Sequence, residues 1–229
     1  MILPSGVSSL DRLLGRGLST GVFTHVFGKA GSGKTTFALM FLRGALKLGV
    51  KTIYINSEAS SPIDRLEQLT GKRFDELEQQ VTLLRPNSFE EQGTIMEDLE
   101  LYLKDETRLV IIDTLTRLYR AVLDDKKTTY IAHRELNRQA GLLKGVSRRK
   151  DIAIIVLNQV RARIDEPEEI EPVAASIMEY WSDYVIRVSI KQAAGSRLIE
   201  RLAPEGEPSS TVLILTSEGF SPIPSREKE

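Results

Sequence analysis

Residues 28–35 read Gly-Lys-Ala-Gly-Ser-Gly-Lys-Thr, at the point where a short apolar run, 22–27, gives way to residues with helical spacing. The glycines allow the backbone to turn tightly, so that successive N–H groups can point at one anion at the N-terminus of the following helix. The lysine and the hydroxyl residue that end the stretch are suited to phosphate oxygens and to Mg²⁺. This pattern predicts a P-loop that binds ATP together with Mg²⁺.

A glycine-rich turn without a ligand is the alternative interpretation of this stretch. The complete motif and its place between a strand and a helix argue against that alternative. Lys34 is expected to neutralise the β and γ phosphates, and the hydroxyl of Thr35 is expected to hold Mg²⁺. The predicted nucleotide-binding residues of the loop are Gly28, Lys29, Ala30, Gly31, Ser32, Gly33, Lys34, Thr35 and Thr36.

The rest of the chain alternates between apolar runs of strand length and amphipathic stretches of helix length. Strands are expected at 22–27, 52–55, 81–84, 109–112 and 152–157, and helices at 35–48, 63–69, 88–104 and 129–149, the third helix opening on a capping box, Ser88-Phe-Glu-Glu91. This alternation predicts an α/β fold with a mostly parallel sheet flanked by helices. Shorter runs at 185–190, 198–202 and 212–215 predict antiparallel strands at one edge of the sheet.

Three polar positions at predicted strand ends are candidates for chemistry beside the P-loop. Asp113 follows the run Leu-Val-Ile-Ile, as a carboxylate that orients Mg²⁺ would. Glu58 follows the second strand, where it could activate a water molecule or be an ordinary loop residue. Asn158 and Gln159 end the strand 152–157, where amides could sense a phosphate or cap the strand. The carboxyl edge of an open α/β sheet is where ligands bind.

Composition narrows the class of protein. The chain has 229 residues, no cysteine and two histidines, which excludes disulfides and thiolate metal sites and disfavours a histidine zinc site. No apolar run reaches the roughly 20 residues that span a bilayer, and the first residues do not form a secretion signal. We expect a cytoplasmic protein without a membrane partner. A single domain is expected over 1–229, with a lead-in segment at 1–21 and a flexible tail at 224–229.

Charge is strongly segregated along the chain. Residues 117–163 hold twelve Lys and Arg against four Asp and Glu, a net charge of +8, while the whole chain has a net charge of −1. A basic stretch of this kind is typical of a nucleic-acid-binding surface, although a solvated helix face is the alternative.

The P-loop, Glu58, Asp113 and Asn158-Gln159, in that order and on those strand ends, resemble the ATPase core of RecA-type recombinases. The stretch Gly6-Val-Ser-Ser-Leu-Asp-Arg-Leu-Leu-Gly15 is similar to the segment that precedes the P-loop in archaeal and eukaryotic members. The resemblance covers about residues 5–222 and is strongest to short archaeal paralogues of the recombinase RadA. It implies a RecA-type P-loop core.

The resemblance also implies roles for individual residues. Glu58 matches the general base, Gln159 the residue that senses the γ-phosphate, and Arg65 an arginine that lies over the adenine. Lys34, Glu58 and Gln159 are therefore the expected catalytic residues. Residues 124–129 match the first DNA-binding loop, and Gln159 opens the second. The expected DNA contacts are Lys126, Lys127, Arg134, Arg161 and Arg163.

The chain also departs from the recombinase pattern. Only about 21 residues precede the first strand, so the N-terminal helical DNA-binding domain is expected to be absent, and the only Phe-x-x-Ala, 27–30, lies in the P-loop and cannot be a tether to a neighbour. The second loop, 160–177, lacks glycine and aromatic residues, which a loop that inserts between bases needs. It carries five carboxylates, Asp165, Glu166, Glu168, Glu169 and Glu171. We expect filament assembly and strand exchange to be lost.

Two further features have open interpretations. Arg134 could contact phosphate and His133 could make binding pH-sensitive, or both could be ordinary residues of a helix surface. Tyr180 and Trp181 could stack on a base or a partner, or belong to the core. The stretch 216–222 is similar to the segment that caps a neighbour's nucleotide, so a homodimer is conceivable.

The sequence thus predicts an ATP-binding accessory protein of DNA repair and homologous recombination, with weak ATPase activity. Its expected partners are single- or double-stranded DNA, a RadA-type recombinase and a junction-processing nuclease. A nucleotide-switched protein-interaction ATPase of the KaiC type, without a DNA role, shares the same core and stays open. A self-sufficient recombinase would need filaments, and a P-loop kinase would need an acceptor site and a lid that the sequence does not show.

Overall fold

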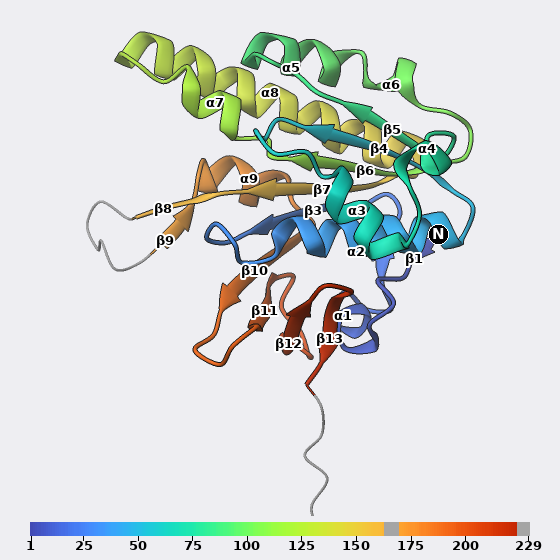
Figure 1. Ribbon diagram of the computed structural model, residues 1–229. Helices are drawn as coiled ribbons and strands as arrows, with labels where there is room; N and C mark the ends of the chain where they lie inside the picture. The colour runs from blue at the N-terminus through green and yellow to red at the C-terminus, as the bar shows by residue number, and fades with distance from the viewer. Residues whose placement is uncertain (163–169, 224–229) are drawn as a thin grey trace, which may run out of the picture.

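A nine-stranded sheet organises the part of the chain that the computed structural model describes, residues 1–162 and 170–223 (Figure 1). Its strands, in spatial order, are β13 (Gly219–Pro222), β12 (Ser210–Thr216), β11 (Ser196–Ala203), β10 (Tyr184–Ile190), β3 (Phe23–Phe27), β7 (Ala153–Asn158), β6 (Thr107–Asp113), β4 (Lys51–Asn56) and β5 (Val81–Leu84). Strands β10, β3, β7, β6, β4 and β5 pair in parallel, and β10 to β13 pair with one another in antiparallel fashion. The predicted fold class is confirmed.

Helices cover both faces of this sheet, as the alternating sequence pattern predicts. In chain order they are α1 (Ser8–Leu13), α2 (Lys34–Lys47), α3 (Ile63–Thr70), α4 (Phe74–Leu77), α5 (Phe89–Glu97), α6 (Leu99–Tyr102), α7 (Arg117–Ala121), α8 (Lys126–Lys150) and α9 (Ala175–Trp181). Figure 1 shows α5 to α8 on one side of the sheet and α2 and α3 on the other. None of the described helices is both long and apolar enough to cross a membrane.

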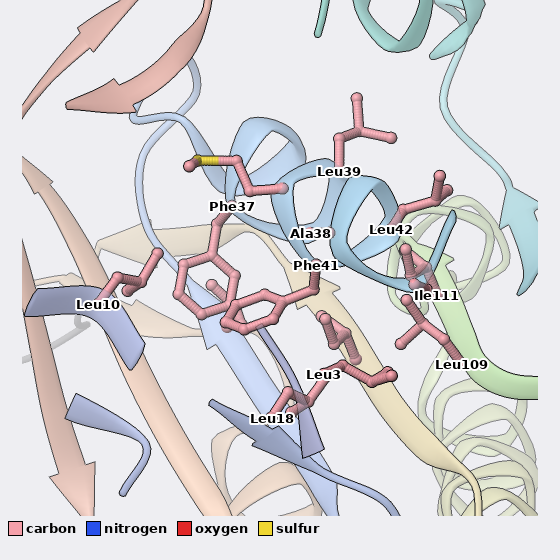
Figure 2. Close-up of a cluster of buried hydrophobic side chains, with 14 of the residues drawn as sticks. Leu3, Leu10, Leu18, Phe37, Ala38, Leu39, Phe41, Leu42, Leu109 and Ile111 are labelled. Carbon is pink, nitrogen blue, oxygen red and sulfur yellow. The ribbon is translucent and has the colours of Figure 1, made fainter. Parts of the chain in front are cut away.

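The central strands divide their side chains between two cores, because successive residues of a strand point to opposite faces. Leu109 and Ile111 of β6 join the core under α2, while Val110 and Ile112 join the core under α8. All four side chains are fully buried. The unbroken apolar run before Asp113 is therefore the mark of a strand that is covered on both faces. Figure 2 shows part of the first core, with Phe37 and Phe41 of α2 among its buried side chains.

The C-terminal strands extend the sheet, and the first of them, β10, pairs with β3 in a direction that the sequence did not predict. β10 lies beside β3 in parallel, with Tyr184 opposite Thr24 and Arg187 opposite Phe27, although it was expected to be antiparallel. Its other edge pairs with β11 in antiparallel fashion. The chain thus changes pairing direction across β10. Two small antiparallel pairs, β1 (Ile2–Leu3) with β2 (Leu18–Ser19) and β8 (Val160–Ala162) with β9 (Ile170–Pro172), lie outside the main sheet.

Two predicted helices differ from the observed ones. The expected helix 88–104 is interrupted at Asp98, which separates α5 from α6. Ser88 does cap α5, since its Oγ accepts a hydrogen bond from Glu91 N at 3.0 Å, but the Glu91 carboxylate accepts from Asn87 N rather than from Ser88, so the capping box is incomplete.

The long helix α8 begins at Lys126, three residues earlier than expected. Asp125 caps it, because Asp125 Oδ1 accepts from Thr128 N at 2.8 Å. Lys126 and Lys127, which were expected in a DNA-binding loop over 124–129, thus lie in the first turn of a helix, and their contact with DNA stays a prediction. The predicted flexible tail, 224–229, lies outside the described residues.

Candidate functional site

The P-loop connects β3 to α2, as the sequence predicts. Gly31 and Gly33 adopt φ angles of +72° and +105°, a left-handed region that other residues rarely adopt, and Gly33 is the N-cap of α2. At Gly28 a Cβ atom would lie 2.2 Å from Val188 O, so only glycine fits there. The glycines are thus required by the backbone path. This path aims the N-terminus of a 14-residue helix at the loop, which favours an anion there.

Lys34 occupies the centre of this loop and is largely buried. Its Nζ donates to Gly28 O at 2.9 Å and to Lys29 O at 3.0 Å. Burial lowers the pKa of Lys34 from its ordinary value, and the nearby carboxylates of Asp113 and Glu58 act in the opposite direction. A cation held among backbone carbonyls at a helix N-terminus is well placed to neutralise phosphate oxygens.

Two C-terminal residues that the sequence did not point to support the P-loop from outside. Arg197 of β11 donates from Nε to Ser32 O at 2.9 Å and from Nη2 to Gly31 O at 3.3 Å. Phe220 of β13 packs against Gly33, where a Cβ atom would lie 2.9 Å from its ring. The antiparallel extension of the sheet therefore fixes the conformation of the loop. No local sequence signal connects residues so far apart in the chain.

Asp113 lies at the end of β6, directly beside the start of α2. Its Oδ2 accepts hydrogen bonds from Thr35 Oγ1 at 2.8 Å and from Tyr54 Oη at 2.7 Å. Burial raises the pKa of Asp113 above its ordinary value, although these two hydrogen bonds favour the ionised form. Burial likewise raises the pKa of Tyr54, and the charge of Asp113 adds to that increase.

One hydroxyl and one carboxylate fit the way in which P-loop proteins hold Mg²⁺, which takes its other ligands from phosphates and water. Thr35 and Asp113 provide this pair, since their side chains are already in contact. Among residues 1–162 and 170–223, no group of three or more His, Cys, Asp or Glu side chains could hold a metal ion by itself. The donor set therefore suits a magnesium ion that arrives with a nucleotide.

Glu58 lies just beyond β4, and three side chains surround its carboxylate. Glu58 Oε1 accepts from Thr114 Oγ1 at 3.0 Å and from Gln159 Nε2 at 3.0 Å. On the other side, Arg117 Nε lies 3.8 Å from Glu58 Oε2. β4, β6 and β7 pair in register, so their carboxyl ends bring Glu58, Asp113 and Gln159 to one edge of the sheet. Thr114 and Arg117 were not predicted, although they lie one and four residues after Asp113 in the sequence.

Asn158 connects this edge to the interior. Its Nδ2 donates to Val173 O at 2.7 Å and lies 3.3 Å from His25 Nε2, while Thr116 Oγ1 donates to Asn158 Oδ1 at 2.5 Å. His25 lies on β3 and is fully buried, and this burial lowers its pKa from 6.5 to about 3. Asn158 therefore joins Val173 of the second loop, Thr116 and the strand before the P-loop in one buried network.

Arg65 lies on α3 and reaches across to the C-terminal strands. It donates from Nη2 to Thr216 O and from Nη1 to Ser217 O, both at 2.7 Å, and its Nε lies 3.4 Å from Thr36 Oγ1. Burial lowers the pKa of Arg65 from its ordinary value. The residue expected over the adenine thus borders the first turn of α2. The stretch 216–222 borders the P-loop of its own chain.

The residues expected to contact DNA are dispersed over the surface near α8. Lys126, Lys127 and Arg134 are exposed on α8 itself. Arg161 of β8 is paired with Glu171, with Nε and Nη2 both 2.8 Å from Glu171 Oε1. Arg163 and four of the five acidic positions of the second loop lie outside the described residues. The structure therefore places three of the five predicted contacts on one helix.

The structure shows which of Tyr180, Trp181 and His133 are buried and which are exposed. Trp181 packs against the core under α8 and donates from Nε1 to Asn137 Oδ1 at 2.9 Å. Tyr180 is 77% exposed, so the core interpretation holds for Trp181 but not for Tyr180. His133 lies on the exposed surface of α8, with Nδ1 3.4 Å from Tyr119 Oη.

A parallel sheet with a P-loop after β3 and with carboxylates at the ends of neighbouring strands defines a RecA-type P-loop core. The model of the Rad51 family matches residues 1–221. The chain belongs to this family.

Individual relatives cover nearly the same length. "DNA repair and recombination protein RadB" of Methanococcoides burtonii is 34% identical over 221 residues, which are 95% of this chain and 96% of the relative. The protein of the same name from Methanosphaera stadtmanae is 33% identical over 212 residues, 89% of this chain and 90% of the relative. A crystal structure of the RadB recombinase is similar with a TM-score of 0.81 and 29% identity, over 97% of this chain and 100% of that one.

Proposed function

We propose that this protein is an ATP-binding accessory factor of DNA repair and homologous recombination. The observation that carries the proposal is the convergence of Lys34, Asp113 and Glu58 at one sheet edge, in a chain similar to proteins named for DNA repair and recombination. The second loop of the same chain is acidic, which is unfavourable for binding between stacked bases. An intact nucleotide site beside an altered DNA loop favours a nucleotide-dependent accessory role over strand exchange.

In this proposal the P-loop residues Gly28 to Thr36 bind the triphosphate, and Lys34 neutralises its β and γ phosphates. Thr35 and Asp113 would hold Mg²⁺, which supplies charge neutralisation on the phosphates when it is bound. Arg65 covers the adenine. The contacts of Asp113 with Thr35 and of Arg65 with Thr36 support these assignments, because both bring the side chain to the first turn of α2.

Hydrolysis would use Glu58 as the general base. Glu58 takes a proton from water, the water oxygen forms a bond to the γ-phosphorus, and the bond from that phosphorus to the bridging oxygen breaks, leaving its electron pair on ADP. Thr114 and Gln159 fix one carboxylate oxygen of Glu58 through hydrogen bonds of 3.0 Å. Gln159 also lies between β7 and β8, directly before the second loop, so it links the nucleotide site to that loop. We expect slow hydrolysis that suits a switch.

DNA is the proposed macromolecular partner, together with a RadA-type recombinase and a junction-processing nuclease, in the cytoplasm. Lys126, Lys127 and Arg134 would bind phosphates of single- or double-stranded DNA. A homodimer is a further proposal, since the stretch 216–222 is similar to a segment that caps a neighbour's nucleotide.

The decisive test measures ATP hydrolysis by the purified protein with and without single-stranded DNA, beside the Glu58→Gln variant. We expect slow hydrolysis that DNA changes and that Glu58→Gln lowers at least about 100-fold, because a general base contributes on the order of 10²- to 10⁴-fold. Strand exchange by the protein alone, without a RadA-type recombinase, would refute the accessory role.

One observation favours the KaiC-type alternative, a nucleotide-switched protein-interaction module without a DNA role. Of the eleven basic residues of the stretch 117–163 that the structure describes, seven form ion pairs with carboxylates of the same chain, which reduces the charge left for DNA. A Lys126→Ala/Lys127→Ala variant that binds DNA as well as the wild type would support this alternative.

A further inference from the structure

Arg117, the first residue of α7, lies beside the carboxylate of Glu58, and the sequence pattern did not point to it. Its Nη1 donates to Ser57 O, and its Nε lies 3.8 Å from Glu58 Oε2. Its side chain is 42% exposed, and it lines a surface cavity of about 530 Å³ with Arg120 and Gln159. The guanidinium is therefore anchored at one end to the backbone beside Glu58 and open to solvent at the other.

Two positively charged side chains near Glu58 indicate where the γ-phosphate of a bound ATP would lie. Lys34 stands on the P-loop side of Glu58, close enough for the two charges to interact, and Arg117 stands on the side of Glu58 Oε2. A general base must lie within about one water molecule of the phosphorus under attack. A cation in contact with that base is consequently within side-chain reach of the γ-phosphoryl oxygens.

We propose that Arg117 contacts the γ-phosphate of ATP bound to the same chain and stabilises the negative charge that develops there during hydrolysis. This inference rests on the proposed function. Many nucleoside triphosphatases receive such an arginine from another protein, and some carry it in the same chain. Here Arg117 already lies at the site of its own chain, so hydrolysis needs no neighbouring subunit to supply this charge.

Arginine suits this position for a geometric reason. The planar guanidinium presents several N–H donors in a fixed fork, so it can hold Ser57 O and still direct another N–H toward a phosphate oxygen. A lysine carries all of its donors on one nitrogen, so it cannot spread them over the width of a guanidinium. If Arg117 only supported the Ser57–Glu58 backbone, its loss would leave the binding of a planar phosphate mimic unchanged relative to the binding of ADP.

The test uses the full chain and a fluorescent ADP analogue, titrated with and without aluminium fluoride, which mimics the transferring phosphoryl group. For the wild type we expect aluminium fluoride to tighten ADP binding at least tenfold. We expect Arg117→Ala and Arg117→Lys to lose most of this gain while binding ADP alone nearly as well as the wild type. Arg16→Ala, which changes an exposed arginine of the segment before the P-loop, is the matched control and should behave as the wild type.

Activity supplies the second measurement. Arg117→Ala should lower kcat for ATP about 10²- to 10³-fold with little change in KM, as the loss of one transition-state donor does. Equimolar Arg117→Ala and Lys34→Ala proteins, when mixed, should recover no activity. Recovery in the mixture would show that Arg117 acts on a neighbouring subunit and would overturn the proposal.

The remaining outcomes separate this inference from the proposed function. If the wild type binds ADP but aluminium fluoride adds nothing, or if Arg117→Ala keeps the full gain, the role of Arg117 is refuted while nucleotide binding stands. If the wild type binds no ADP analogue at all, the proposed function fails, and the role of Arg117 fails with it.

Discussion

At the scale of single residues, His25 shows how burial couples protonation to folding. Its pKa is lowered from 6.5 to about 3, so between these values the unfolded chain binds a proton that the folded chain does not. Stability therefore falls as the pH drops through this window, by about 1.4 kcal/mol per pH unit for one proton. Denaturant unfolding of the wild type and of His25→Gln at pH 7, 6, 5 and 4 would measure this.

The His25→Gln variant should lose the part of the slope that His25 contributes, although its stability at pH 7 will also change because the ring stacks on Phe27. The comparison is thus between slopes and not between absolute stabilities. Identical slopes for the two proteins would contradict the assignment to His25.

Asp113 illustrates a cost of the nucleotide site. Burial raises the pKa of Asp113, so the folded chain keeps the carboxyl proton to a higher pH than the unfolded chain does. Stability therefore falls as the pH rises from the ordinary value of 3.8 through the raised one, and the whole cost is present above it. We expect Asp113→Asn to melt a few degrees higher than the wild type at neutral pH without nucleotide, and to bind MgATP at least tenfold more weakly. The gain in melting temperature should disappear in acid, where the wild-type carboxyl is also neutral.

Thermal melting from pH 4 to pH 8 tests this prediction, and Asp105→Asn, at an exposed aspartate, serves as the control. A lower melting temperature for Asp113→Asn at neutral pH would show that the hydrogen bonds from Thr35 and Tyr54 outweigh the burial of the charge.

The site residues that could be predicted from the sequence are those that belong to a short motif of neighbouring residues. The P-loop and the strand that ends in Asp113 each consist of consecutive residues. Their place in the fold and the ligand that they bind can therefore be predicted from the sequence. Tyr54, Thr114 and Arg197 contact these residues through pairing of distant strands. No spacing along the chain encodes such contacts, so they emerge only from the three-dimensional structure.

At the scale of elements, the N-terminus of α5 is capped by a single side chain, that of Ser88. Ser88 Oγ accepts from Glu91 N at 3.0 Å, and Glu91 itself is turned toward Asn87. Ser88→Ala should therefore lower the free energy of unfolding by about 1 kcal/mol, the typical contribution of an N-cap. Urea unfolding measures the effect, with Ser176→Ala on the exposed surface of α9 as the control. Equal losses in both variants would show that the cap contributes nothing specific.

Elements with a clear period were predicted to within a few residues, and the errors have physical causes. The break at Asp98 leaves the helical periodicity of 88–104 intact, so the pattern does not reveal it. The parallel pairing of β10 with β3 depends on which strand lies beside it, and a strand's own sequence does not specify the direction of its neighbour. Strand β13 was missed because its four residues contain glycine and proline, which are typical of turns.

At the scale of the whole molecule, the basic surplus of residues 117–163 is smaller than the sequence suggested, because most of it is neutralised within the chain. Arg149 and Lys150 both pair with Glu100, and Lys144 and Arg148 both approach Asp183. These pairs tie α8 to α6 and to the start of β10.

Lys126, Lys127 and Arg134 form no ion pair with a described residue, so they are the cations of α8 most available to DNA. Each phosphate contact to single-stranded DNA contributes about 0.7 to the slope of log affinity against log salt. The triple alanine variant should therefore bind single-stranded DNA more weakly at low salt and reduce the slope by about 2. Arg149→Ala/Lys150→Ala is the matched control, since its cations are paired with Glu100 and should change the slope little. Salt titrations of DNA binding decide between the two functions: a wild-type affinity that does not respond to salt, or a triple variant with an unchanged slope, would favour the protein-interaction module.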